Sequence, residues 1–397
     1  MNKTNRLFGI PLVGHLQAPL PVAPPKVQVA KAHVAQGNEA FQPLPVPTGA
    51  APYRITLESV LSGSDSGRAQ LKAIQKSGKL VLHTVGDTGG IMDAVPQTIV
   101  VKKMAEQLLV PEQDRPAFFY HLGDVVYFKG EAGNYFPQFY EAYQNYTVPV
   151  FAIPGNHDGT PPGDGESSLG AFMRNFCNVN PVITPEAVDV NRTAMTQPNC
   201  FFTLEAPFVT LIGLYSNVPS GGRIEQDQLS WFIGELKNAS KSKALIVAVH
   251  HPIYSADDHH SGSTALEALL DGAYKTAKRL PDAVLNGHVH NFQRFTRQYG
   301  KKTVPYFVAG AGGYHNLHGM QKAPDGGQLP VPYAVNGELQ LDDYAKSRHG
   351  FVRVTASKNE LLFEYFTVPR PHESWSSPAE RFNTCRLDWR KGIILPS

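Results

Sequence analysis

The sequence is short of cysteine, of unbalanced charge and of long apolar runs. Its 397 residues include 3 cysteines, 36 Lys+Arg and 34 Asp+Glu, so the formal net charge is +2. Three cysteines cannot build a disulfide framework, and we expect three buried thiols. Balanced charge provides no field that attracts nucleic acid or an anionic membrane, and no apolar run reaches the roughly 18 residues of a membrane-spanning helix. The sequence therefore predicts neither a nucleic-acid nor a membrane partner.

Motifs of several nucleotide-binding and zinc enzymes are missing as well. The chain has no GxxxxGK[ST] phosphate-binding loop and no HExxH zinc motif. A glycine-rich turn at Gly310–Gly313 follows a predicted strand, as a dinucleotide-binding fingerprint should, but His315 stands where the third glycine belongs. We therefore exclude a Rossmann-type cofactor site.

The first 53 residues differ in composition from the rest. Residues 11–53 contain nine prolines, which predicts an extended arm over 1–53 that is suited to docking a protein partner. The apolar stretch Leu7–Ala23 is interrupted by Pro11 and Pro19, so it lacks the clean apolar core of a signal peptide. We predict a cytoplasmic protein, with a periplasmic or secreted location as the alternative.

A single domain is predicted over residues 54–397, with a loop insertion at about 160–200. In this domain, polar residues follow apolar strands directly at their C-terminal ends. Five predicted strands end in this way: Lys79–Val85, Ala117–Leu122, Val148–Ile153, Lys243–Val249 and Ala283–Asn286. Because ligands bind at the carboxyl ends of the strands in α/β sheets, we expect these polar residues to form one composite site.

The residue types at these strand ends are those of a metal centre. Carboxylate and amide oxygens, a phenol and imidazoles suit Fe, Mn or Zn. They are too many for one ion but fit two ions that share a bridging carboxylate, an arrangement that promotes in-line displacement at phosphorus. The candidate ligands are Asp87, Asp124, Tyr127, Asn156, His250, His288 and His290.

Five short blocks in the order of the chain resemble a known family. They are Gly86-Asp87-Thr88-Gly89, Gly123-Asp124-Val125-Val126-Tyr127, Gly155-Asn156-His157-Asp158, Val247-Ala248-Val249-His250 and Gly287-His288-Val289-His290. Together they resemble the calcineurin-like metallophosphoesterases. More narrowly, the chain resembles the purple acid phosphatase branch. It has Gly89 where most of the superfamily has a metal-binding histidine, and Tyr127 where the protein phosphatases have an aspartate.

The resemblance implies a role for each residue. Asp87, Tyr127 and His290 would hold Fe(III), Asn156, His250 and His288 would hold a divalent Fe, Zn or Mn, and Asp124 would bridge the two ions. His157 would contact the substrate and protonate the leaving group as the catalytic residue. His259 and His260, nine and ten residues after His250, would also bind the substrate.

The resemblance also implies the fold and the activity. The fold would be α/β, a four-layer α/β/β/α sandwich of two mixed β-sheets flanked by helices. The enzyme would be an acid phosphatase-like phosphomonoester hydrolase that acts on small phosphate esters, with metal-bound hydroxide attacking phosphorus in line. A phosphodiesterase of the same superfamily and a non-catalytic scaffold with the same fold are the alternatives.

Polar residues near the blocks receive structural roles. Asp158 is expected either to orient His157 or to cap the following turn. His83 and His121 lie inside predicted strands and are interpreted as core histidines with satisfied hydrogen bonds. His318, after the glycine-rich turn, is not assigned to the site.

Overall fold

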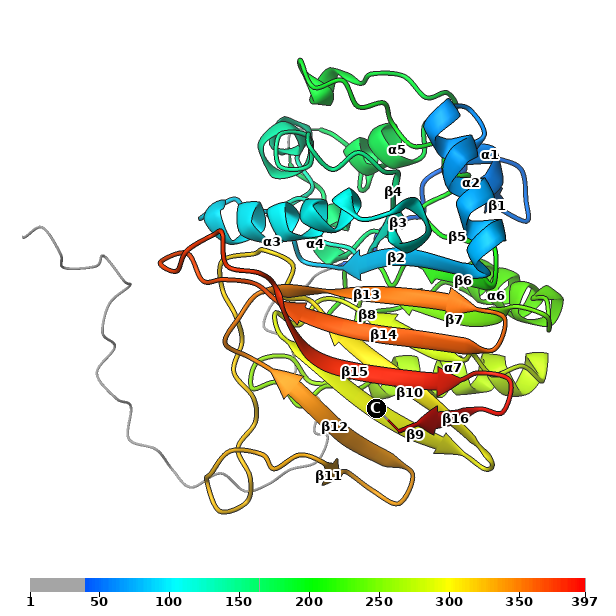
Figure 1. Ribbon diagram of the computed structural model, residues 1–397, viewed down its shortest axis with the longest axis vertical. Helices are drawn as coiled ribbons and strands as arrows, with labels where there is room; N and C mark the ends of the chain where they lie inside the picture. Colours follow the sequence, from blue (N-terminus) through cyan, green and yellow to red (C-terminus); the bar gives the residue numbers. More distant parts are fainter. Residues whose placement is uncertain (1–39, 164, 397) are drawn as a thin grey trace, which may run out of the picture. The chain divides into compact units, whose positions relative to one another are not determined.

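The computed structural model describes residues 40–163 and 165–396, which lie in one compact unit, His33–Ser397 (Figure 1). Two mixed β-sheets form the middle of this unit, and helices flank them. None of the helices in the described residues is long and apolar enough to span a bilayer. The three cysteines are buried free thiols, as predicted.

One sheet has seven strands. They are β2 (Lys79–Val85), β3 (Pro116–His121), β4 (Val150–Ala152), β13 (Gly350–Ser357), β14 (Glu360–Thr367), β15 (Glu380–Asp388) and β16 (Ile393–Leu395). Their order is β16-β15-β14-β13-β2-β3-β4. The strands β2, β3 and β4 are parallel, whereas β13 to β16 form an antiparallel half. The parallel strands are buried over nearly their whole length, which explains their continuous apolar sequences.

The other sheet has nine strands. They are β1 (Arg54–Thr56), β5 (Phe202–Glu205), β6 (Val209–Leu214), β7 (Ala244–Val249), β8 (Ala283–Asn286), β9 (Phe292–Tyr299), β10 (Lys302–Ala309), β11 (Tyr333–Ala334) and β12 (Leu339–Ala345). Their order is β1-β5-β6-β7-β8-β10-β9-β12-β11, with β6, β7, β8 and β10 parallel to one another. Each sheet therefore contains a parallel block of three or more strands, and in the nine-stranded sheet β1 and β5 form a further parallel pair.

The two sheets pack face to face through aromatic rings. Phe307 of β10 stacks on Phe363 of β14 with ring centres 4.4 Å apart, and Phe292 of β9 stacks on Tyr365 of β14 at 4.0 Å. All four side chains lie in one buried cluster that takes residues from both sheets. This cluster is the central core of the unit.

Helices cover the outer faces of both sheets. The helix α3 (Val95–Glu106) packs its buried side chains in one cluster with β2 and β3. On the other side, α6 (Gln226–Asn238) and α7 (Thr264–Ala277) pack in a cluster with β6 and β7. Two further helices, α1 (Leu57–Leu61) and α2 (Asp65–Ser77), contribute to the central core. The predicted four-layer α/β/β/α sandwich is confirmed.

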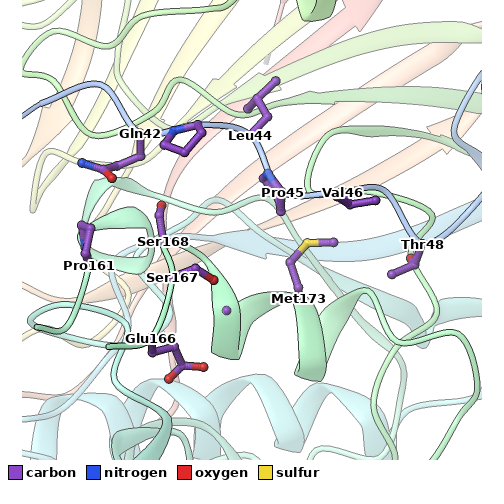
Figure 2. A pocket seen from close by; sticks show the side chains of 12 residues that line it. Gln42, Leu44, Pro45, Val46, Thr48, Pro161, Glu166, Ser167, Ser168 and Met173 are labelled. Carbon is purple, nitrogen blue, oxygen red and sulfur yellow. The ribbon is translucent and has the colours of Figure 1, made fainter. Parts of the chain in front are cut away.

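The described part of the proline-rich arm, residues 40–53, contacts the loop insertion. The backbone N–H groups of Thr48 and Gly49 donate to the carbonyl of Pro198, at 3.1 and 2.9 Å. The insertion itself contains the short helix α5 (Gly170–Phe176), whose phenylalanines are buried. A pocket of about 470 Å³ lies between the arm and the insertion (Figure 2), and no candidate ligand lines it. The arm before residue 40 is outside the described residues, so its extent stays a prediction.

Candidate metal centre

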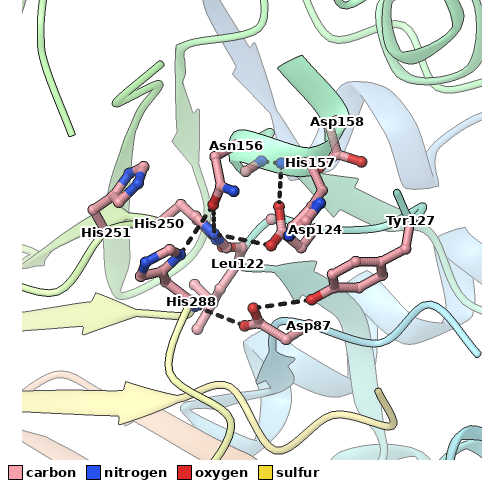
Figure 3. A network of polar contacts seen from close by, with 12 residues as sticks. Asp87, Leu122, Asp124, Tyr127, Asn156, His157, Asp158, His250, His251 and His288 are labelled. Carbon is pink, nitrogen blue, oxygen red and sulfur yellow. Dashed lines mark hydrogen bonds and ion pairs between the residues drawn. The ribbon is translucent and has the colours of Figure 1, made fainter. Parts of the chain in front are cut away.

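The carboxyl ends of the two parallel blocks meet at one place. The N–H of Gly86, after β2, donates to the carbonyl of Ala309, at the end of β10, over 2.9 Å. The Nδ1 atom of His250, after β7, donates to the carbonyl of Leu122, after β3, over 2.8 Å. Both contacts join one sheet to the other. The seven candidate ligands follow β2, β3, β4, β7 and β8, so the fold brings them together. Figure 3 labels all of them except His290.

Three of the candidates form a first group. The phenol oxygen of Tyr127 lies 3.3 Å from Oδ1 of Asp87 and 3.3 Å from Nε2 of His290. The same histidine nitrogen lies 3.6 Å from Oδ1 of Asp87. Burial, together with the carboxylates of Asp124 and Asp87, raises the pKa of Tyr127 well above its usual value. A phenolate here therefore requires a cation beside it.

Three other candidates form a second group. The side-chain oxygen of Asn156 lies 3.1 Å from Nε2 of His250 and 2.9 Å from Nδ1 of His288. Burial lowers the pKa of His250, but the charge and hydrogen bond of Asp124, together with Asp87 and the carbonyl of Leu122, outweigh it and raise that pKa to about 9. Burial lowers the pKa of His288 well below its usual value. His288 is therefore neutral and free to act as a ligand.

Asp124 stands beside the second group. Its Oδ2 atom lies 3.3 Å from Nε2 of His250, and its Oδ1 atom accepts from the backbone N–H of His157 over 2.9 Å. Burial raises the pKa of Asp124, but the charges of His250 and His157 more than offset this and hold it below its usual value. Asp124 thus stays ionised.

Both groups have the size of a metal site. Nitrogen and oxygen ligands held about 2.0–2.1 Å from an ion in tetrahedral geometry lie about 3.3 Å from one another. The separations within the two groups are 2.9–3.6 Å. The donor atoms are carboxylate, phenol, amide and imidazole, a set that suits iron, zinc or manganese. The residues therefore fit two ions.

Glycines make room for these groups. A Cβ atom at Gly89 would lie 2.8 Å from the ring of Tyr127 and 2.3 Å from the amide oxygen of Gln138. A Cβ atom at Gly155 would lie 2.1 Å from Oδ1 of Asp124. A side chain at position 89 is thus incompatible with the observed place of Tyr127, which gives the Gly89–Tyr127 combination of the sequence a steric reason.

His157 lies at the edge of the first group. Its ring centre is 4.5 Å from that of Tyr127, and its Nδ1 atom lies 2.7 Å from the backbone carbonyl of Phe128. A carbonyl can only accept a hydrogen bond, so Nδ1 carries a proton. The Nε2 atom is the nitrogen left to contact a substrate.

The two other predicted substrate-binding histidines have different surroundings. The ring of His260 lies 4.6 Å from that of His288, so it is next to the second group. His259 is exposed, its Nδ1 lies 2.6 Å from Oδ1 of Asp258, and its ring stacks on His318 at 4.9 Å. The structure therefore brings His260 to the candidate centre and leaves His259 one ring farther out.

The stretch of chain that carries the site matches a known protein family. The model of the calcineurin-like phosphoesterases matches residues 81–292, more than half of the chain. The chain belongs to the calcineurin-like phosphoesterase family. This matched range contains the five strand ends and all seven candidate ligands.

Relatives in this family bear the name of acid phosphatases. Purple acid phosphatase 21 of Arabidopsis thaliana is 30% identical over 191 residues, which are 43% of this chain and 41% of that protein. Tartrate-resistant acid phosphatase type 5 of Rattus norvegicus is 24% identical over 306 residues, 72% of this chain and 90% of that protein. The chain thus spans less than half of the plant relative and most of the rat one. These relatives support a hydrolase of the acid phosphatase type.

Solved structures agree on the fold. Purple acid phosphatase PPD1 from yellow lupin seeds has a TM-score of 0.56 at 16% identity, over 78% of this chain and 54% of that one. GAP50, described as the anchor in the inner membrane complex of Plasmodium, has a TM-score of 0.51 at 16% identity, over 77% of this chain and 89% of that one. At such identities the likeness shows the fold alone.

Asp158 ties together two loops that carry candidate ligands. Its buried carboxylate accepts from the backbone N–H groups of Val125 and Val126, each at 3.1 Å, and from Gly155 at 2.9 Å. It has no hydrogen bond to the ring of His157 within the described residues. Neither expected role describes it fully, because it fixes the loop after β3 as well as the turn after β4. Sequence reasoning could not see this contact between loops.

Asp257 is another buried carboxylate, and no sequence motif pointed to it. Its Oδ2 atom accepts from the backbone N–H groups of His259 and His260, at 3.0 and 2.8 Å, and lies 3.3 Å from Nδ1 of His318. Its Oδ1 atom accepts from Asn291, next to the candidate ligand His290, over 2.9 Å. Asp257 therefore fixes the loop with the two histidines against the loop after β8, and its oxygens are already engaged.

The two core histidines are hydrogen-bonded, as predicted. His83 lies 2.9 Å from the phenol of Tyr146 and 3.0 Å from the amide oxygen of Gln107. His121 lies 2.8 Å from the hydroxyl of Thr88. Burial lowers the pKa of both histidines to about 3. Both are neutral parts of the core. His121 lies close enough to Asp124 and His250 for their charges to affect its pKa, and its Nδ1 accepts from the N–H of Gly123 over 3.2 Å.

Proposed function

We propose that the protein hydrolyses phosphomonoesters at a centre of two metal ions. The observation that carries the proposal is the pair of donor groups, each of 2.9–3.6 Å between ligand atoms, with ionised Asp124 beside them. Asp87, Tyr127 and His290 are proposed to hold Fe(III). A divalent Fe, Zn or Mn is proposed for the second group, and Asp124 for the bridge.

The ions and the chain have separate tasks in this proposal. When bound, two such ions supply an acidified water as nucleophile and positive charge against the phosphoryl oxygens. His157, with a proton on Nε2 as well as on Nδ1, gives the Nε2 proton to the leaving oxygen as the bond to phosphorus breaks, while Nδ1–H stays bonded to the carbonyl of Phe128. The nearby ring of His260 supports a role in binding the phosphoryl group, and we propose a weaker one for His259, which is farther away.

A phosphodiesterase of the same superfamily is the rival enzyme. Metal-assisted attack on phosphorus serves both kinds of ester, so the metal groups do not distinguish them. The test compares kcat/KM for phenyl phosphate with that for the diester bis(4-nitrophenyl) phosphate. A higher value for the monoester supports the proposal, whereas a diester value far above the monoester value would replace it.

A scaffold without catalysis is the rival from another class. One fold does not imply one function, and GAP50, which has a similar fold, is described as an anchor. The decisive measurement is the metal content of protein purified without added metal or chelator. About two ions per chain, one of them iron, supports the proposal. No metal after reconstitution, together with no hydrolysis, would favour the scaffold.

Two predictions from the sequence remain open. A protein partner for the arm over residues 1–53 would be supported if deletion of these residues leaves activity and solubility intact but abolishes capture of that partner. A cytoplasmic location would be overturned by recovery of the protein in a periplasmic or culture fraction.

A further inference from the structure

Two aromatic side chains, Phe128 and Tyr314, lie next to Tyr127 of the first group. Phe128 is 39% exposed, and its ring centre lies 6.3 Å from those of His157 and Tyr314. Tyr314 is half-buried and stacks on Tyr127 at 4.2 Å. The rings of Phe128 and Tyr314 are nearly perpendicular, at 82°. We call Phe128 and Tyr314 the aromatic rim.

The backbone that carries Phe128 is held in place. Its carbonyl accepts from Nδ1 of His157 at 2.7 Å. On the preceding residue, the carbonyl of Tyr127 accepts from the side-chain amides of Gln138 and Asn134, at 2.8 and 3.2 Å. The exposed ring is thus mounted on a segment with fixed hydrogen bonds. A group that binds against it meets a surface that is already ordered.

The position of the rim bears on the leaving group of the substrate. A general acid must reach the oxygen that it protonates, within about 2.6–3.2 Å. If His157 is that acid, as the proposed function requires, the carbon atoms attached to the leaving oxygen lie beside the His157 ring. The exposed aromatic side chain next to that ring is Phe128.

We propose that the aromatic rim is a subsite for aromatic leaving groups, so that the enzyme prefers aryl phosphate monoesters to alkyl ones. The inference rests on the proposed function of His157. A flat ring can pack in an offset or edge-to-face arrangement on Phe128 and Tyr314, whereas a small polyol has no ring and makes neither contact. The chemistry is unchanged: water replaces the leaving oxygen on phosphorus, and that oxygen takes its proton from His157.

The test measures kcat/KM for phenyl phosphate and for glycerol 2-phosphate in the full-length, metal-loaded protein. The variants are Phe128→Ala, which removes the ring, and Phe128→Leu, which keeps an apolar side chain. Comparing each variant with the wild type on the same substrate cancels the intrinsic reactivity of the two esters. Phe382→Ala is the matched control, since Phe382 is 46% exposed and lies on β15, in the antiparallel half.

The expected result is selective. Phe128→Ala lowers kcat/KM for phenyl phosphate about three- to tenfold and changes that for glycerol 2-phosphate by no more than about twofold. For phenyl phosphate, kcat/KM of Phe128→Leu lies between those of Phe128→Ala and the wild type. Phe382→Ala has the kcat/KM of the wild type on both esters. Metal content, measured on every variant, stays at the wild-type level.

Two other results would overturn the subsite. Equal losses on both esters in Phe128→Ala would mean that Phe128 only supports His157. No loss on either ester would mean that the leaving group does not contact the rim. A wild-type protein that holds its metals but hydrolyses neither ester would instead refute the proposed function itself, so the two failures are distinguishable.

Discussion

The parallel strands and the antiparallel strands of the molecule have different functions. In the parallel blocks, every strand runs the same way, so the carboxyl ends of β2, β3 and β4 meet those of β7 and β8 at one edge. In the antiparallel half, β13, β14 and β15 alternate, so their carboxyl ends lie at opposite edges. Only the parallel arrangement gathers the residues that follow several strands into one place.

The backbone at the two halves differs as well. Asp87, Asp124 and His288 have φ angles of +59°, +53° and +68°, which are rare for residues with side chains. Beyond His288, none of the described residues except glycines has a positive φ. Among the described residues, three of the nine non-glycine residues with a positive φ are thus candidate ligands, and none of the nine lies in β13 to β16. Stability and chemistry should therefore be separable by mutation.

The largest effect is expected from Asp124→Asn in the parallel half. The amide keeps the size of the side chain but removes the negative charge proposed to bridge two cations, so turnover should be abolished and both metal occupancies should fall. Elemental analysis and steady-state kinetics check this. Asp388→Asn, on β15, is the matched control and should retain both metals. Wild-type activity in Asp124→Asn would rule out the two-metal centre.

His157→Ala separates proton transfer from metal binding. His157 is not among the proposed ligands, so metal content should stay unchanged while kcat falls by about 10²–10⁴. The loss should be smaller for an ester whose leaving group needs no proton, such as 4-nitrophenyl phosphate, than for an alkyl phosphate. An equal loss on both esters would count against His157 as the general acid.

Phe363→Ala should lower stability without changing activity, because the ring of Phe363 stacks on Phe307 in the core between the sheets. Removal of a buried phenylalanine costs about 3–5 kcal/mol of unfolding free energy. Chemical denaturation measures this cost. Below the unfolding transition, metal content and kcat should match the wild type. A loss of metal in folded protein would show that the two halves are coupled.

The pH dependence of stability should reveal His83, at the junction of β2 and β13. Burial, with a smaller effect of Arg353, lowers the pKa of His83 to about 3, while the hydrogen bond with Gln107 opposes the shift. Above its unfolded pKa of about 6.5 both states are neutral. Below it only the unfolded state gains a proton, so stability falls as the pH drops from 6.5 towards 3, by about 2 kcal/mol at pH 5.

Denaturation of His83→Gln between pH 7 and 5 checks this. The variant should lose stability at pH 7 but show a weaker fall towards pH 5 than the wild type. His372→Gln, at an exposed histidine, should leave the fall unchanged. An identical slope in His83→Gln and the wild type would exclude His83 as a source of acid sensitivity.

The smallest effect is expected at the surface of the antiparallel half. Glu360 and Arg386 pair at 2.9 Å with side chains 31% and 42% exposed. Exposed ion pairs contribute about 0–1 kcal/mol because water screens them. Glu360→Gln should lower the unfolding free energy by less than about 1 kcal/mol and leave activity intact. A loss as large as that of Phe363→Ala would contradict this assignment.

Much of the fold could be predicted from local sequence. Lys79–Val85 was expected as a strand and is β2, and Ala283–Asn286 is β8. Buried parallel strands are readable because both of their faces are apolar. The three buried thiols and the hydrogen-bonded His83 and His121 were also predicted correctly.

The supporting residues of the site could not be predicted in the same way. Asp158 and Asp257 each accept hydrogen bonds from backbone groups, and no local pattern marks a carboxylate for that role. Phe128 and Tyr314 are 186 positions apart in the sequence, yet their ring centres lie 6.3 Å apart, and the ring of Phe128 is also next to that of His157. Such contacts depend on how loops from different strands face one another.

The sequence by itself determined the apolar strands and the polar residues that end them, because both are properties of neighbouring residues. Only the tertiary structure decided which of those ends meet. It set the distances of 2.9–3.6 Å within the donor groups and brought His260 closer to them than His259. The physical reason is that strand direction and sheet packing, which link residues far apart in the chain, fix the geometry of the site.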